Sequence, residues 1–133
     1  AADADKYKTA ADCKDLTFAV EAGSAGEAAA KENGFKYITV TKQADALTEV
    51  KAGTSDAAII DSLMAGAMVG EGTGYADLTY TAALTSEQYG VGFRKGSDLA
   101  AKLNEFFKKA YADGSMKATA EKYGVQAALI EQK

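Results

Sequence analysis

Two short stretches of the chain carry the residue types best suited to binding a small ligand. Gly23 and Ser24 separate an apolar run from an alanine-rich segment, and Asp61 directly follows the apolar run 56–60. Glycine lets a backbone turn tightly, and the amides at the start of a helix favour a carboxylate or a phosphate. A carboxylate beside a cation forms a charge-assisted hydrogen bond. Together the two positions would complement a zwitterion such as a free α-amino acid.

Both positions also have a purely structural interpretation. The residues SAGE at 24–27 fit a capping box, in which the serine and glutamate side chains satisfy backbone amides. Asp61 could likewise cap the helix that follows it. A capped helix start can still keep one amide for a ligand, so Ala25 joins the candidate set and both interpretations stay open.

Other polar residues are weaker candidates. Glu21 precedes the glycine corner, where it would repel an acidic ligand side chain and tolerate a neutral or basic one, or it is simply a solvated charge at a strand end. Thr41 and Gln43 follow the second predicted strand and could lie on the rim of the same site. Asp56 begins the third strand at its opposite end, so we expect it to be structural.

An alternation of strands and helices must position these residues. Helices are predicted over 24–33, 43–52 and 62–69, and they alternate with strands over 16–20, 35–40 and 56–60. Such alternation predicts βαβ units with a parallel sheet. In the spatial order 2-1-3, right-handed crossovers place the first two helices on opposite faces. The loops after the first and third strands then diverge, and open α/β sheets bind ligands in that crevice.

The remaining segments extend this α/β fold. We expect one helical turn within 1–15, a flexible glycine-rich loop over 70–77, and strands over 78–82 and 89–96, the latter ending in a turn. The loop is not a phosphate loop, because it follows a helix and lacks a Gly-Lys-Ser/Thr ending. Two further helices are predicted over 97–111 and 115–123, and the tail after Gly124 could add another turn. In the first of them Leu99, Leu103, Phe106, Phe107 and Tyr111 are expected to face inward.

Composition argues against several classes of function. The net charge of −4, the pI near 4.8 and a single arginine, Arg94, are unfavourable for binding nucleic acid or an anionic membrane. Histidine is absent and Cys13 is the only cysteine, which disfavours zinc sites and histidine-dependent or cysteine-dependent catalysis. We therefore expect no enzyme, no metal and no cofactor, although a mechanism based on carboxylates or lysines stays open. No apolar run approaches the length of a membrane span.

Four stretches within residues 7–124 carry a family resemblance. In order they are DLTFAVEAGSAGE, QADALTEVKAGTSDAAIIDS, EQYGVGFRKGSDL and NEFFKKAYADGSMKATAEKYG. They resemble the polar amino-acid solute-binding proteins of ABC importers, which have the type II periplasmic-binding-protein fold. The resemblance implies an extracytoplasmic protein, periplasmic or extracellular and with a lipid anchor as an option, that works with transporter membrane subunits. It also implies that the Gly23-Ser24 corner meets a ligand's carboxylate and that Asp61 binds its α-ammonium.

The resemblance does not include a first lobe, which in that family supplies an aromatic wall and an arginine for the ligand. Arg94 does not match that arginine. Residues 1–86 would be the second lobe, an open and mostly parallel sheet with helices on both faces. Residues 87–133 would be the returning strand and two helices that normally complete the first lobe. We expect this segment to fold back on the lobe or to be exchanged between chains of a homodimer. The alternative functions are a ligand-sensing domain of a receptor and a dehydratase-like enzyme on the same fold.

Overall fold

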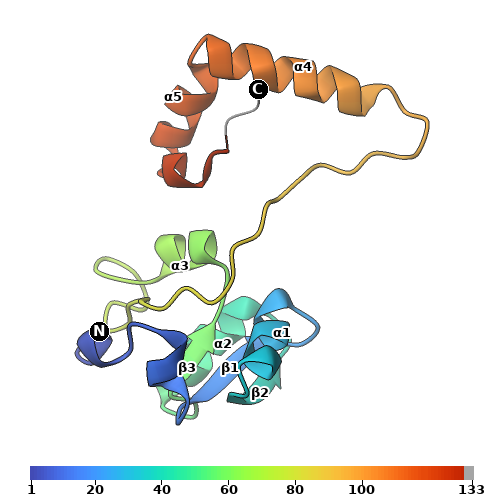
Figure 1. Ribbon diagram of the computed structural model, residues 1–133. Coiled ribbons are helices and arrows are strands. Elements are labelled where there is room, and N and C mark those ends of the chain that lie inside the picture. Colours follow the sequence, from blue (N-terminus) through green and yellow to red (C-terminus); the bar gives the residue numbers. More distant parts are fainter. Residues whose placement is uncertain (131–133) are drawn as a thin grey trace. The chain divides into compact units, whose positions relative to one another are not determined.

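A computed structural model describes residues 1–130 of the chain (Figure 1). The chain divides into two compact units, Ala1–Ser86 and Glu87–Lys133. The first unit contains the sheet and its helices, and the described residues of the second contain two helices and a short 3-10 turn.

The sheet of the first unit has three parallel strands. β1 (Thr17–Glu21) lies in the centre, between β2 (Lys36–Val40) and β3 (Ala57–Ile59). Val20 of β1 pairs with Thr39 on one side and with Ile59 on the other. The strand order is β2-β1-β3, the order on which the expected crevice depends, and it puts the carboxyl ends of all three strands at one edge.

The first two helices cover the sheet on its two faces. α1 (Ala25–Glu32) packs its Ala30 with Phe18 and Val20, which point to the same side of β1. Ala19 points to the other side and is fully buried. α2 (Gln43–Ala52), which contacts β1 and β3, buries Ala46 and Leu47. The opposite placement follows from right-handed crossovers in this strand order.

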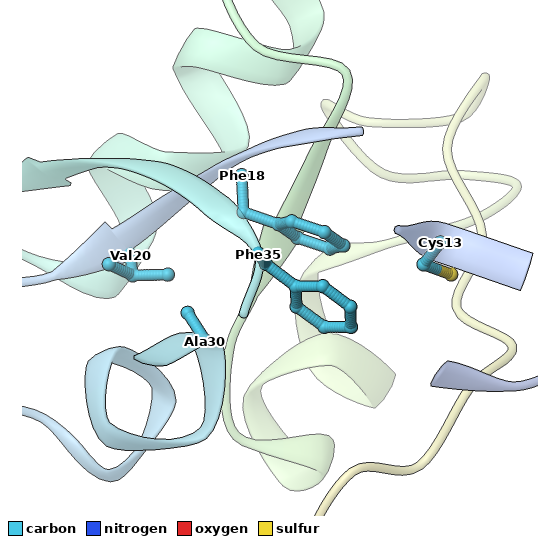
Figure 2. Packing of buried hydrophobic residues seen from close by; sticks show 5 residues of the cluster. All are labelled: Cys13, Phe18, Val20, Ala30 and Phe35. Atoms are coloured by element: carbon cyan, nitrogen blue, oxygen red, sulfur yellow. The ribbon is translucent and has the colours of Figure 1, made fainter. Parts of the chain in front are cut away.

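The main hydrophobic cluster lies on the α1 side of the sheet (Figure 2). The rings of Phe18 and Phe35 are stacked, with centroids 4.7 Å apart and planes 20° from parallel. Cys13, the last residue of the 3-10 helix η2 (Ala10–Cys13), closes the cluster on the side of the amino-terminal segment. Another 3-10 helix, η1 (Ala4–Lys6), precedes η2. The sequence predicts one helical turn within residues 1–15, and the structure has these two. Burial raises the pKa of the Cys13 thiol, and the nearby charge of Asp12 adds to this effect.

The glycine-rich loop after α3 (Ser62–Met68) is held against α2. Lys51 donates a hydrogen bond from Nζ to the carbonyl oxygen of Gly74 at 2.8 Å, and the hydroxyls of Thr48 and Tyr75 lie 3.2 Å apart. Val69 and Tyr75 also form an isolated parallel bridge. The loop predicted to be flexible is therefore anchored at three points.

Two predicted strands are absent from the described residues. The segment 78–82 is extended but unpaired, and its Thr81 hydroxyl donates to the carbonyl oxygen of Tyr7. The segment 89–96 has a turn at 95–96 but no strand. Both segments have the composition of a strand, yet a strand also needs a neighbour for its backbone groups, and neither segment finds one. The predicted carboxyl-terminal strand is therefore wrong for this structure.

The second unit is a helix pair. α4 (Leu99–Ala112) and α5 (Ser115–Lys122) bury Ala110 and Ala120, and η3 (Gln126–Ala128) supplies the predicted turn in the tail. Leu103, Phe107 and Tyr111 are half-buried as expected. Leu99 is 50% exposed and Phe106 59% exposed, so the prediction that they face inward is wrong here. Residues 131–133 of the tail lie outside the described residues.

No helix among residues 1–130 is long and apolar enough to cross a membrane.

Candidate functional site

The corner after β1 is a tight turn that leads directly into α1. Gly23 has φ of +74°, a left-handed conformation that glycine adopts without steric cost. The amide of Ser24 donates to the carbonyl oxygen of Glu21 at 3.2 Å and closes the turn. Ala22 extends the sheet by one bond, because its amide donates to the carbonyl oxygen of Val40 at 3.0 Å. The corner is thus fixed to the carboxyl ends of both β1 and β2.

Ser24 caps α1 as the sequence suggests, but the reciprocal bond differs from a standard capping box. Its Oγ accepts a hydrogen bond from the amide of Glu27 at 3.1 Å. The Glu27 carboxylate reaches one residue further back and accepts from the amide of Gly23 at 2.7 Å. The hydroxyl of Tyr37, on β2, donates to the other oxygen of Glu27 at 3.4 Å. Glu27, in the first turn of α1, therefore stabilises the glycine corner through its side chain.

The first two amides of α1 remain available. Among the described residues, neither the N–H of Ala25 nor that of Gly26 has a hydrogen-bond acceptor. Ala25 is exposed and Gly26 is half-buried. Unpaired amides at a helix start attract an anion, both as donors and through the helix dipole. The amide of Ala25 therefore stays a candidate for ligand binding, and the amide of Gly26 is a second candidate.

Asp61 lies at the end of β3 and caps α3. One carboxylate oxygen, Oδ1, accepts from the amides of Leu63 at 2.9 Å and Met64 at 3.1 Å. The residue is half-buried. An ionised carboxylate has two oxygens and about four acceptor positions. The predicted capping role and a role toward a cation are compatible.

The start of α1 and the end of β3 pack closely because Gly26 has no side chain. A Cβ at Gly26 would lie 3.1 Å from the carbonyl oxygen and 3.2 Å from Cγ2 of Ile59, the last residue of β3. The start of α1 therefore packs directly on the strand end that leads to Asp61. This contact brings amides that favour an anion and a carboxylate that favours a cation to the same edge of the sheet.

The other sequence candidates lie around this edge. Glu21 is the last, half-buried residue of β1, and Thr41 is exposed just after β2. Gln43 begins α2, and its Oε1 accepts from the amide of Asp61 at 2.7 Å. Asp56 lies at the opposite end of β3 and pairs with Thr17 through both its amide and its side chain, which confirms its structural role.

Sequence reasoning did not identify three features of this edge. The sequence pattern indicates Gly26 only as part of a cap, although the absence of a side chain there lets α1 pack closely on β3. The bond from Gly23 to Glu27 and the bond from Asp61 to Gln43 were not foreseen either. The spacing of Glu27 from Ser24 is a local sign of the bond to Gly23. The bond between Asp61 and Gln43 joins residues 18 positions apart and has no local signature.

The described part of the chain has no cluster of metal-binding side chains at this edge. No group of three or more His, Cys, Asp or Glu residues there could hold a metal ion. A concavity of about 460 Å³ lies between the end of α2 and residues 73–78.

Comparison with known proteins gives one informative match. No family model matches the chain, and no curated protein matches it. A mutant of ArgBP, an arginine-binding protein from T. maritima, has a similar solved structure, with a TM-score of 0.72 and 32% sequence identity. The match covers 88% of this chain and 51% of that protein, so the chain spans about half of its length. The chain thus has the α/β fold of a periplasmic-binding-protein lobe.

Proposed function

We propose that the first unit binds the shared backbone groups of a free amino acid. The amides of Ala25 and Gly26 would receive the α-carboxylate, and Asp61 would receive the α-ammonium. The observation that supports the proposal is the close packing of Gly26 on Ile59, because α1 then begins beside the strand that leads to Asp61. The carboxyl edge of the sheet, beside the central strand of a β2-β1-β3 order, is where open α/β sheets bind ligands.

The ligand class that fits best is a neutral or basic amino acid. Glu21 ends the central strand beside the glycine corner, so its charge would attract a basic side chain and repel an acidic one. The matched ArgBP is named for arginine, which agrees with this preference. L-Arginine is therefore the first ligand to test.

The wider role that we propose is that of a solute-binding component of an amino-acid importer, acting outside the cytoplasm with transporter membrane subunits. Residues 1–86 would be the second lobe of such a protein. A lobe alone makes about half of the contacts and leaves the ligand in water, so its affinity should be weak. The match to one half of a longer binding protein supports this proposal.

Residues 87–133 would complete a fold by packing on another surface. Tyr89 is 75% exposed and Val91 62% exposed, in addition to the open Leu99 and Phe106 of α4. Large exposed apolar groups of this kind favour association. We propose that this segment folds back on the first unit or is exchanged with a second copy. Light scattering of the chain over a range of concentrations tests exchange, and a strictly monomeric chain would rule it out.

An NMR titration of the full chain tests amino-acid binding even at millimolar affinity. With L-arginine we expect saturable shifts of the Ala25, Gly26 and Asp61 amide signals, and with L-glutamate much smaller ones. Recovering the amino acid unchanged after incubation would distinguish binding from turnover. Shifts confined to other parts of the chain, or none for any of the twenty amino acids, would contradict the proposal.

A further inference from the structure

Gln43 links two loops that come from different strands. It is the first residue of α2, after β2, and its side chain reaches the residue that follows β3. Oε1 of Gln43 accepts a hydrogen bond from the amide of Asp61 at 2.7 Å. The bond is partly buried, and it joins residues 18 positions apart in sequence.

This bond gives the backbone N–H of Asp61 a hydrogen-bond acceptor. Asp61 is the residue before α3, so its N–H has no acceptor within that helix. Its carboxylate is held from the other side, by the amides of Leu63 and Met64. With its amide bound to Gln43 and its Oδ1 bound to the helix, both the backbone and the side chain of Asp61 have a set orientation.

We infer that Gln43 is a positioning residue for Asp61 and so for recognition of the ligand's α-ammonium group. The inference rests on the proposed function, because it assigns Gln43 a task within that site. Gln43 does not need to touch the ligand: its carbonyl oxygen holds the backbone from which the Asp61 side chain extends. Such preorganisation raises affinity by removing the cost of ordering the group on binding.

The chemistry of the bond suggests two informative substitutions. Gln43→Met keeps the length of the side chain but removes the oxygen acceptor. Gln43→Glu keeps an oxygen acceptor in the same place. Gln126→Met makes the same chemical change at an exposed residue of the second unit and serves as the matched control.

The first measurement does not require a ligand. In amide hydrogen exchange followed by NMR on the full chain, we expect Asp61 to exchange about tenfold faster in Gln43→Met, which corresponds to about 1.4 kcal/mol of local opening. Gln43→Glu should restore most of the protection, and Gln126→Met should leave it unchanged. Unchanged exchange of Asp61 in Gln43→Met would overturn the inference about Gln43 while leaving the proposed function intact.

The second measurement separates positioning from general stability. L-Arginine and its des-amino analogue, guanidinopentanoic acid, are titrated into each variant. We expect Gln43→Met to lose about tenfold in affinity for L-arginine and about twofold or less for the analogue, which lacks the ammonium group. An equal loss for both ligands would show a merely structural role. If the unchanged chain binds no L-arginine, the proposed function and the ligand part of this inference both fail, whatever the exchange rates show.

Discussion

The two units of the chain bury their apolar side chains to very different extents. In Ala1–Ser86 the middle of the central strand is buried, with Ala19 and Val20 at 0% exposure and the Phe18 and Phe35 rings stacked. Among the described residues of Glu87–Lys133 the buried hydrophobic residues are Ala110 and Ala120, whereas Phe106 is 59% exposed. The first unit has a core of its own, and the described part of the second unit leaves large apolar side chains exposed.

This difference shows which part of the chain is self-sufficient. A sheet covered on both faces can exclude water without help from elsewhere. A pair of helices that buries only small side chains gains little from burial, since the stabilisation scales with the apolar area removed from water. In the second unit, Val91, Phe93, Leu103 and Phe107 line an open concavity of about 190 Å³ instead of filling a core. The first unit should therefore be stable on its own core, whereas the second unit should tend to associate.

The largest expected effect comes from the same substitution made in both units. Phe18→Ala removes a buried ring from the stack with Phe35 and should lower the free energy of unfolding by about 3–5 kcal/mol. Phe106→Ala removes an exposed ring and should lower it by about 1 kcal/mol or less in dilute solution. Urea unfolding followed by circular dichroism measures both.

The size of the Phe106→Ala effect also tests whether the exposed apolar side chains of the second unit are buried in solution. A loss that appears only at high protein concentration would indicate exchange between chains. A loss comparable with that of Phe18→Ala at every concentration would show that the second unit has a packed core in solution, and the contrast between the units would then be wrong.

A smaller effect is expected from filling the contact between α1 and β3. Gly26→Ala would place a Cβ 3.1 Å from the carbonyl oxygen of Ile59, a fixed backbone atom, and should destabilise the first unit by about 1–3 kcal/mol. Gly92→Ala, in the second unit, would meet no atom within 4 Å and should be close to neutral. Thermal unfolding of the two variants measures the difference, and equal melting temperatures would argue against close packing of α1 on β3.

The single thiol reports on the first unit alone. Cys13 is 5% exposed and its pKa is raised by burial, so less thiolate is present at a given pH than for a free cysteine. At pH 8 we expect Cys13 to react with a disulfide reagent at least about tenfold more slowly in the folded chain than in urea. Phe18→Ala should speed the reaction and Phe106→Ala should not. Fast labelling of the unchanged chain would mean that the amino-terminal segment does not cover the core.

The smallest effect is a pH dependence at the turn between α4 and α5. Hydrogen bonds from Ser115 lower the pKa of the Asp113 carboxyl below its usual value of 3.8, and the amide of Ser115 donates to its Oδ1 at 2.9 Å. Because the folded pKa is lowered, this contribution is present above pH 3.8 and is lost as the pH falls through the folded pKa. In Asp113→Asn the helical circular-dichroism signal should change less with pH in that acid range than in the unchanged chain. An identical acid titration for both chains would exclude this contribution.

The sequence predicts the first unit far better than the second for a physical reason. The cap at Ser24 and the cap at Asp61 follow from local patterns, such as an apolar run followed by a glycine or an N-cap residue. The parallel pairing is typical of strands that alternate with helices. The segments 78–82 and 89–96 have strand-like composition, but pairing depends on a neighbour that local sequence does not specify. The bond from Gln43 to Asp61 is also non-local, and it depends on how two loops meet once the sheet has formed.

The anchoring of the glycine-rich loop has a consequence for where a protease can cut the chain. Proteases need several residues that can detach and extend, and exposed glycine-rich loops are usual sites of nicking. Here the bonds that Lys51 and Thr48 make to Gly74 and Tyr75 hold residues 70–77 close to α2. Residues 87–94 are exposed throughout and belong to no helix or strand. Limited digestion should therefore sever the chain there first and release the sheet unit whole.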